Sequence, residues 1–261
     1  MVSTEAPASA EKGGASSRAL GFYCLALMGS AQVAWPLVTD SRIATNTTVL
    51  ALCFSVVFFA ASRWKSERIL WTFISVSFFC LLIEIIGVRT GFPFGTYAYG
   101  DDLKPTILGV PAIVPLAWFA MSLPAWEIAR RLVPHRRWLR ALVGGAALTA
   151  WDVFLDPQMV QEGFWFWPGG GFWQEVPLSN YLGWLATATV LMLGLSRLLD
   201  DARSNPWLVI VYVWMAGAET LGFLLPFAFD RPVIALVGGA IMLPPGVIAL
   251  RSYRRPWLAS E

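Results

Sequence analysis

The sequence has very little of what metal and redox chemistry needs. Its 261 residues include one histidine, His135, and three cysteines, Cys24, Cys53 and Cys80, each in a different apolar segment. A single histidine cannot supply a histidine-rich di-iron site, which argues against an oxygen-dependent membrane hydroxylase or desaturase. The cysteines have no metal-ligand spacing, so we expect them to be small core residues without a disulfide.

Phosphate-binding glycine motifs are also missing. The sequence contains neither a G-x-G-x-x-G pattern nor a P-loop, which argues against nucleotide or flavin chemistry. We therefore expect no cofactor and no metal. Charged residues are scarce, at 14%, whereas hydrophobic residues make up 57% and the mean hydropathy is +0.60. This composition is typical of a multi-pass membrane protein and argues against an ordinary soluble domain.

Eight apolar segments are long enough to cross roughly 30 Å of bilayer hydrocarbon, which takes about 20 helical residues. They lie at about 19–38, 43–61, 69–88, 107–129, 138–156, 179–199, 207–229 and 233–250. The sequence thus predicts an all-α, polytopic membrane bundle of about eight helices, with 18–252 as a single transmembrane domain. Very short connections predict that the first and the last pairs of helices are antiparallel hairpins.

Both ends of the chain are expected to be cytoplasmic tails. Residues 1–17 are small and polar without an apolar run, which predicts a disordered tail and not a cleavable signal, and 253–261 should form a second tail. Fifteen Lys and Arg residues fall on the side of the termini and four on the other side. Because basic residues are enriched in cytoplasmic loops, we expect a cell-membrane protein with both termini inside. The loops 89–106 and 157–178 then face outside.

The segment 151–181 joins two apolar segments and carries acids without a neutralising base. It holds Asp152 and Asp156 among tryptophans and phenylalanines, with no Lys, Arg or His. A spacing of four puts both carboxyl groups on one helix face, and Pro157 is expected to end or kink that helix. Carboxyl groups next to hydrocarbon are costly unless a partner or a function retains them. A plainer interpretation is that Asp156 begins a turn before Pro157 and Asp152 bonds a neighbouring helix.

Two further acids lie in apolar helices. Glu84 has its nearest cation five positions away at Arg89, and Glu219 has none before Arg231. Each is a candidate functional group, although a protonated acid in an interhelical hydrogen bond would also explain it. With both termini inside, Glu84 should lie near an outer helix end and Glu219 near mid-depth.

Together, Glu84, Asp152, Asp156 and Glu219 indicate proton transfer. Burial disfavours the charged form of a carboxyl group, so these acids are expected to stay protonated near neutral pH and to be able to donate a proton. If two of them share a site, one can act as the acid while the other remains a base.

Aromatic side chains crowd both outer loops. They can stabilise a transient cation through their ring faces, or they can form an interfacial aromatic belt. Those of the first loop are expected to fold back over the mouth of the bundle as a lid or substrate wall. The residues are Phe92, Phe94, Tyr97 and Tyr99 in the first loop, and Trp151, Phe164, Trp165, Trp167, Trp173 and Tyr181 in and around the second.

At these residues the sequence resembles the bacterial and archaeal carotenoid 1,2-hydratase family, the type that includes gamma-carotene and bisanhydrobacterioruberin hydratases. The matching stretches are EIIGVRTGFPFGTYAY at 84–99, LGVPAIVPLAWFAM at 108–121, and WDVFLDPQMVQEGFWFW through PLSNYLGW at 151–184. The resemblance covers roughly 80–225, whereas the first two spans and the tail match only in hydrophobicity. It implies water addition to the terminal isopropylidene double bond of an acyclic carotenoid, giving a tertiary alcohol without redox cofactor or metal.

That chemistry agrees with the residues present. Hydrating a trisubstituted alkene takes protonation of the less substituted carbon, a tertiary carbocation and capture of water. We expect Asp152 or Asp156 to donate the proton, with Asp152 preferred as the deeper of the two. Glu84 or Glu219 would orient the water and accept its proton, assisted by Gln158 and Asn180. The expected substrate-binding residues are Phe92, Phe94, Tyr97, Trp151, Gln158, Trp165, Trp167, Asn180 and Tyr181.

The resemblance also implies partners. These are a lipophilic carotenoid of the lycopene, gamma-carotene or bisanhydrobacterioruberin class, the lipid bilayer and other membrane enzymes of the carotenoid pathway, with no nucleic acid.

Three other functions compete with a hydratase. A carotenoid cyclase uses the same protonation without water, and the sequence separates the two poorly. A membrane prenyltransferase would use the D-x-x-x-D spacing of Asp152 and Asp156, but it needs magnesium and nearby Lys or Arg to bind diphosphate, and these acids face the side poor in basic residues. A proton-coupled carrier would need polar residues through both halves of the membrane, whereas the inner halves of the spans are almost wholly apolar.

Overall fold

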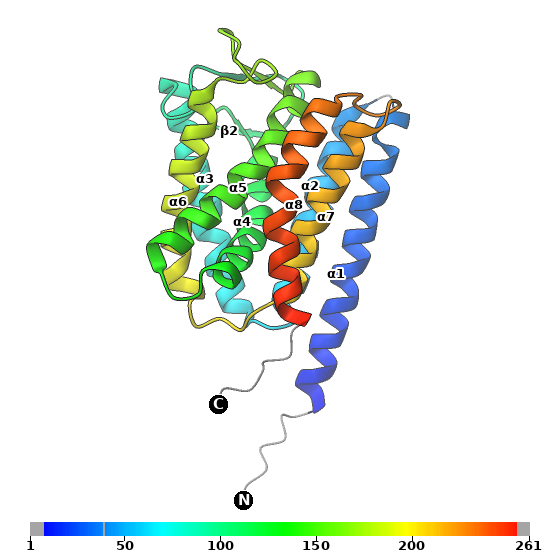
Figure 1. The fold of residues 1–261 in the computed structure, drawn as a ribbon, viewed down its shortest axis with the longest axis vertical. Coiled ribbons are helices and arrows are strands. Elements are labelled where there is room, and N and C mark those ends of the chain that lie inside the picture. The colour runs from blue at the N-terminus through cyan, green and yellow to red at the C-terminus, as the bar shows by residue number, and fades with distance from the viewer. Residues whose placement is uncertain (1–7, 39, 255–261) are drawn as a thin grey trace, which may run out of the picture.

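The computed structural model describes residues 8–38 and 40–254, whose helices run up and down one bundle (Figure 1). The helices are α1 (Ala8–Ala34), α2 (Ser41–Ala61), α3 (Ser66–Thr90), α4 (Ile113–Leu132), α5 (Arg137–Gln161), α6 (Leu178–Leu199), α7 (Pro206–Leu224) and α8 (Pro232–Arg254), with a 3-10 turn η1 (Trp35–Leu37) after α1. Of the described helices, seven are long and apolar enough to cross a membrane, that is, all except α4. The predicted all-α polytopic membrane bundle is therefore confirmed.

Helix α4 forms the centre of the bundle. It packs against α2, α3, α5, α7 and α8, and every side chain from Trp118 to Ala129 is buried. A helix buried on all sides belongs in the interior. Because its neighbours enclose it, α4 can carry Glu127, whose carboxyl group accepts a hydrogen bond from Ser204 at 2.6 Å.

The pairs α1–α2, α5–α6 and α7–α8 make the most extensive helix contacts, so the hairpins predicted at the two ends of the sequence are confirmed. Helices α5 and α6 come very close at Gly145, where a Cβ atom would lie 2.4 Å from Thr189 Oγ1 and 2.9 Å from Thr189 N. Small residues permit such an approach between membrane helices. The contact fixes α6 against α5, the helix that carries both aspartates.

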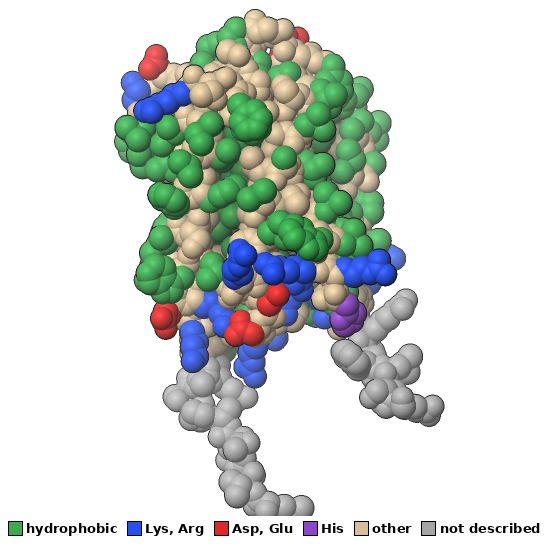
Figure 2. Space-filling view, turned by 90° about the vertical axis from the view of Figure 1, so that its left-hand side faces the viewer, with side chains coloured by type: hydrophobic (Ala, Val, Ile, Leu, Met, Phe, Trp, Pro, Cys, Tyr) green, Lys and Arg blue, Asp and Glu red, His purple; other side chains and the backbone are tan. Residues whose placement is uncertain are grey.

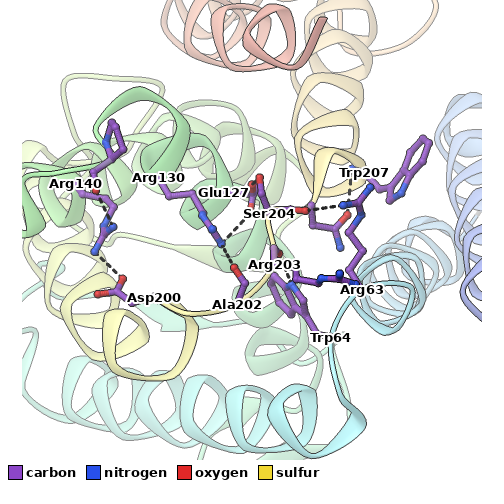
Figure 3. Close-up of polar contacts among 12 residues, drawn as sticks. Arg63, Trp64, Glu127, Arg130, Arg140, Asp200, Ala202, Arg203, Ser204 and Trp207 are labelled. Carbon is purple, nitrogen blue, oxygen red and sulfur yellow. Dashed lines mark hydrogen bonds and ion pairs between the residues drawn. The ribbon is translucent and has the colours of Figure 1, made fainter. Parts of the chain in front are cut away.

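Basic side chains gather at the end of the bundle where α1 begins and α8 ends, visible as the blue band low in Figure 2. There Arg140 pairs with Asp200 at 2.6 Å, and Arg130 Nη1 donates to the Ala202 carbonyl at 2.9 Å (Figure 3). These contacts fasten the α6–α7 connection to α4 and α5.

The opposite end is closed by the two long connections, α3–α4 and α5–α6, which lie at the top in Figure 1. Strand β1 (Ala98–Tyr99) of the first connection pairs antiparallel with β4 (Trp165–Phe166) of the second, and this pair is called the β1–β4 ribbon below. Strands β2 (Thr106–Ile107) and β3 (Val110–Pro111) form a separate hairpin. The ribbon thus joins two loops that are far apart in the sequence.

Of the two outcomes expected at Pro157, an end or a kink of the helix, the end is wrong, because α5 continues to Gln161. Proline has no N–H to donate to the carbonyl one turn earlier, which belongs to Val153. Trp173 Nε1 donates to that carbonyl at 3.4 Å instead. The indole therefore supplies the donor that the proline lacks, and the helix carries Asp156 in regular geometry.

Helix α7 ends at Leu224, earlier than the apolar segment 207–229 predicts. The next residue, Leu225, is extended, as expected for a residue before a proline. Glu219 therefore lies five residues from the end of its helix, closer to that end than the apolar segment 207–229 predicts. It is in the last turns of α7, at the end of the bundle where the outer loops lie.

The tails differ from expectation where they are described. Helix α1 begins at Ala8, so much of the segment 1–17 that was expected to be disordered is helical. Helix α8 extends to Arg254. The remainders of the two predicted tails, 1–7 and 255–261, lie outside the described residues.

We expect the outer-loop end of the bundle to face outside the cell, because the opposite end carries most of the Lys and Arg residues. The test uses a cysteine-free background with single cysteines at Gly169 or His135, both exposed. A membrane-impermeant thiol reagent applied to intact cells should label the cysteine at 169 and not that at 135. Labelling at 135 with protection at 169 would overturn the orientation.

Candidate active site

A cavity lies at the outer-loop end of the described bundle, between α2, α3, α4, α5, α6 and α7. It encloses about 1220 Å³ of empty space, including its open mouth. The end of α1, turn η1 and both outer loops complete its wall, which is mostly aliphatic and aromatic. A large apolar cavity with a few convergent polar groups is the usual form of a small-molecule site.

Glu84 projects into this cavity from the last turns of α3. It is 4% exposed, and its Oε2 accepts hydrogen bonds from Tyr97 at 2.5 Å and Tyr99 at 2.8 Å. Both tyrosines come from the first outer loop. Burial and the neighbouring Glu84 raise the pKa of each tyrosine well above its usual value. Both hydroxyl groups therefore stay protonated and act as donors to the glutamate.

Asp152 and Asp156 lie one turn apart on α5, on the same side of the helix. Asn180, from the first turn of α6, donates through Nδ2 to Asp152 Oδ2 at 3.0 Å and also to Asp156 Oδ2. Asp156 Oδ1 accepts from Trp165 Nε1 at 3.0 Å. One amide group thus holds two carboxyl groups together in a site where both aspartates are at most 2% exposed.

The β1–β4 ribbon connects these two groups of acids. In its register Tyr99 lies directly opposite Trp165, with the ring centroids 5.8 Å apart. Tyr99 donates to Glu84, whereas Trp165 donates to Asp156. A single cross-strand pair therefore provides a hydrogen-bond donor to an acid on α3 and to another on α5.

Tryptophans form a large part of the remaining wall. Trp118 of α4 and Trp184 of α6 are stacked, with centroids 4.4 Å apart and planes 19° apart. Trp167 Nε1 donates to the Phe94 carbonyl at 3.1 Å and so holds the two outer loops together. The aromatic side chains of the first loop do fold over the cavity, with the exception of Phe92, which is 71% exposed.

The structure brings most of the predicted site residues together, but not all of them. Asp152 is fully buried and does not form part of the cavity wall, so its position does not support the preference for it as the proton donor. Tyr181 packs against Phe172 and also lies outside the wall. The predicted residues that line the cavity are Glu84, Asp156, Glu219, Phe94, Tyr97, Trp151, Gln158, Trp165, Trp167 and Asn180.

Glu219 lines the same cavity but stands apart from the other acids. Glu84 interacts electrostatically with both aspartates, whereas no titratable group of the described chain acts on Glu219 in this way. Among the described residues, Glu219 also has no hydrogen bond or ion pair to a side chain. The cavity thus has one polar region in which Glu84 and Asp156 accept hydrogen bonds from protein donors, and a second polar group, Glu219, without a protein partner among the described residues.

Several wall residues have no candidate role in the sequence analysis. Trp118 and Trp184 lie within apolar helices, where a tryptophan is more often a core residue than a binding residue. Gln32 and Thr48 belong to the first two spans, which match the family only in hydrophobicity, yet both line the cavity. The one signal for Gln32 was a polar residue inside an apolar span.

The described residues offer no group of three His, Cys, Asp or Glu side chains arranged to hold a metal ion. Instead, a hydroxyl group donates to Glu84 Oε2, and N–H groups donate to both carboxyl oxygens of Asp156. The arrangement is suited to holding and moving protons.

Replacing Asn180 by alanine should destabilise the protein. The change removes the shared donor of two buried carboxyl groups, and a buried acceptor left without its partner costs about 1–3 kcal/mol. The measurement is thermal or denaturant unfolding of the purified protein in detergent. Leu178→Ala, on the same turn but at a 55% exposed side chain, is the control and should change little. Equal stability of wild type and Asn180→Ala would show that the shared hydrogen bond is not structural.

Comparison with known proteins agrees with this site. Residues 45–245 match the family model described as carotenoid biosynthesis protein. Over 175 residues the chain is 36% identical to the bisanhydrobacterioruberin hydratase of Haloarcula japonica, a match that covers 61% of this chain and 58% of that protein. No solved structure matches the chain. Because the family model spans more than half of the sequence, the chain belongs to the carotenoid biosynthesis protein family.

Proposed function

We propose that the protein adds water across the terminal isopropylidene double bond of an acyclic carotenoid end, giving a 1-hydroxy end group. The observation that carries the proposal is an aromatic-walled cavity inside a membrane bundle into which Asp156 and Glu84 both project. Membership of a carotenoid biosynthesis family and 36% identity to a protein named as a hydratase support it. The lipophilic substrate would reach the cavity from the bilayer.

Asp156 is the proton donor in this mechanism. It faces the cavity, and Trp165 and Asn180 fix its carboxyl group from two sides. Asp152 accepts a hydrogen bond from the same Asn180 side-chain amide. Two buried carboxyl groups on one donor would repel each other if both were charged, so the pair retains a proton between them. That proton passes from Asp156 to the less substituted alkene carbon and leaves a tertiary cation.

Glu84 orients the attacking water. Its carboxyl group accepts two tyrosine O–H bonds and so stays fixed. As the water oxygen bonds to the cationic carbon, one water proton passes to Glu84, and proton exchange within the cavity that both acids line returns a proton to Asp156. The net change is the addition of one water molecule, and the acids end in their starting states. This balance needs no oxidant, reductant or leaving group.

The tryptophan walls protect the cation. Ring faces attract a positive charge, and the stacked pair of Trp118 and Trp184 forms one side of the cavity. A wall with few polar atoms also limits how many water molecules can reach the cation.

The function is tested by expression in a lycopene-producing host followed by mass analysis of the pigments. A gain of one water mass per reacted end is expected from the wild-type protein. An Asp156→Asn strain with equal membrane content serves as the control and should accumulate unmodified pigment. A ring-closed product of unchanged mass would identify a cyclase, and a prenyl-extended product would identify a prenyltransferase.

We expect the activity to be independent of metals and nucleotides. The reasons are the single histidine, the absence of phosphate-binding loops from the sequence, and a mechanism that needs only proton transfer. Purified protein treated with a strong chelator should hydrate its substrate at the same rate as untreated protein. Loss of turnover that magnesium restores would contradict this and would favour the prenyltransferase.

Replacing Asp156 by asparagine should remove the activity while the protein still inserts and binds pigment. General acid catalysis contributes about 10²–10⁴-fold, and an alkene has no easier protonation route, so the loss should reach the upper end. Asp152→Asn should cost less, because Asp152 does not face the cavity. Reaction in deuterated water should place one deuterium on the carbon next to the new alcohol carbon. A fully active Asp156→Asn protein would move the donor role to Asp152 or Glu84.

A further inference from the structure

We propose that Trp118 is a positioning residue for the attacking water, which is held between its indole N–H and the carboxyl group of Glu84. The two residues come from α4 and α3, and both line the cavity. The inference rests on the proposed hydratase function. It concerns the capture of water, which is the step that separates a hydratase from a cyclase.

The indole nitrogen of Trp118 is a hydrogen-bond donor that no group of the described chain uses. Trp118 is 1% exposed, and its Nε1 is buried without a hydrogen-bond partner among the described residues. Trp165 and Trp167, in the same wall, each donate to a protein acceptor. A buried polar group without a partner is costly and rare, and such a group in a cavity wall indicates a ligand.

Glu84 offers an acceptor close to this donor. Tyr97 and Tyr99 both donate to its Oε2, whereas its Oε1 accepts no hydrogen bond from a described residue. Trp118 lies close enough to act on the charge of the Glu84 carboxyl group, yet its Nε1 makes no direct hydrogen bond. A donor and an acceptor, both with unused capacity, are therefore neighbours in the cavity wall.

One water molecule satisfies both groups and keeps the electron pair that the reaction needs. It accepts a hydrogen bond from Trp118 Nε1 with one lone pair and donates one O–H to Glu84, so the second lone pair is free. That lone pair forms the C–O bond with the tertiary cation, and the proton shared with Glu84 passes to the carboxylate. Because the wall is mostly apolar, a water elsewhere in the cavity would find few partners.

Both partners of this water are held in place. Trp118 stacks on Trp184, with the ring centroids 4.4 Å apart and the planes 19° apart. Two tyrosine hydroxyl groups hold the carboxyl group of Glu84. Groups that are fixed before the reaction orient the reacting atoms without a further loss of freedom. The protein thus sets the position of the water before the cation forms.

A cation that meets no water has a different fate. It gives a proton back to Asp156 and becomes an alkene again. In deuterated water the acid delivers deuterium, so an alkene that forms in this way can keep deuterium on the carbon that was protonated. The ratio of deuterium-exchanged alkene to hydrated product therefore reports the capture of water separately from the protonation.

The experiment measures this ratio for lycopene in deuterated water, with purified wild-type protein and two variants. Trp118→Phe keeps an aromatic ring and removes the N–H. Trp151→Phe is the matched control, because Trp151 also lines the cavity and its Nε1 is also buried and unpartnered in the described part of the chain. The groups that act on Glu84 include Trp118 and not Trp151.

Trp118→Phe should raise the ratio of exchanged alkene to hydrated product about tenfold, the size of effect expected from one hydrogen bond. Trp151→Phe should leave the ratio close to that of the wild type. Damage to the ring packing alone would lower both products together and would not change the ratio. An unchanged ratio in Trp118→Phe, or an equal rise in both variants, would overturn the proposal. So would a wild-type protein that exchanges deuterium without adding water.

A wild-type protein that neither exchanges deuterium nor hydrates lycopene would reject the proposed function and not the water site. In that case a crystal structure that resolves ordered water decides. A water within about 3.2 Å of both Trp118 Nε1 and a Glu84 oxygen, lost in Trp118→Phe, supports the site. A direct hydrogen bond between Trp118 and Glu84, with no water between them, rejects it.

Discussion

The structure depends on one constraint: carboxyl groups next to hydrocarbon are costly unless hydrogen-bonding groups hold them, and for Glu84, Asp152 and Asp156 the protein itself provides these groups. Asp152 and Asp156 share the amide of Asn180, and Glu84 takes the hydroxyl groups of two loop tyrosines. The loops are thus part of the interior, because they deliver donors that the apolar helices cannot provide. A lid that only covered the cavity would leave Glu84 without its two tyrosine donors and Asp156 with Asn180 alone.

Close packing of the apolar helices holds the acidic side chains of the bundle in place. The central helix α4 is enclosed by its neighbours, and its Trp118 stacks on Trp184 of α6. The close approach of α5 and α6 at Gly145 sets the register in which Asn180 meets both aspartates. The position of one amide in the site therefore depends on a helix contact several turns away along α5.

Much of the fold follows from the sequence, because hydrophobic length and charge asymmetry are local properties that any membrane-spanning chain must show. The acids at positions 84, 152, 156 and 219 also stand out in the sequence, because charge is rare there. Their partners do not. Tyr99 and Trp165 lie opposite each other because of the register in which the two strands pair. The residue pattern within either loop does not predict that register.

The course of α5 past Pro157 and the early end of α7 were beyond sequence reasoning for a similar reason. The proline rule assumes that no outside group replaces the lost donor, and Trp173, sixteen residues away in the chain, does so. The end of α7 lies inside an apolar segment, where hydropathy does not separate helix from turn. Gln32 and Thr48 were missed because an isolated polar residue in a span usually has a local partner, and only the three-dimensional arrangement shows that these two retain free capacity.

The cross-strand pair in the β1–β4 ribbon has a consequence for how the cavity can open. Gly100 and Gly163 lie against each other beside this pair, with a Cβ atom at Gly100 only 2.4 Å from the Gly163 carbonyl oxygen. A side chain at position 100 would not fit there, so the two strands can pair this closely only because that position is glycine. If they separate, Glu84 and Asp156 each lose a donor in the same movement. A long, rigid pigment that entered over the loops would dismantle the acid groups on its way in, whereas one that slipped sideways between helices would find them assembled.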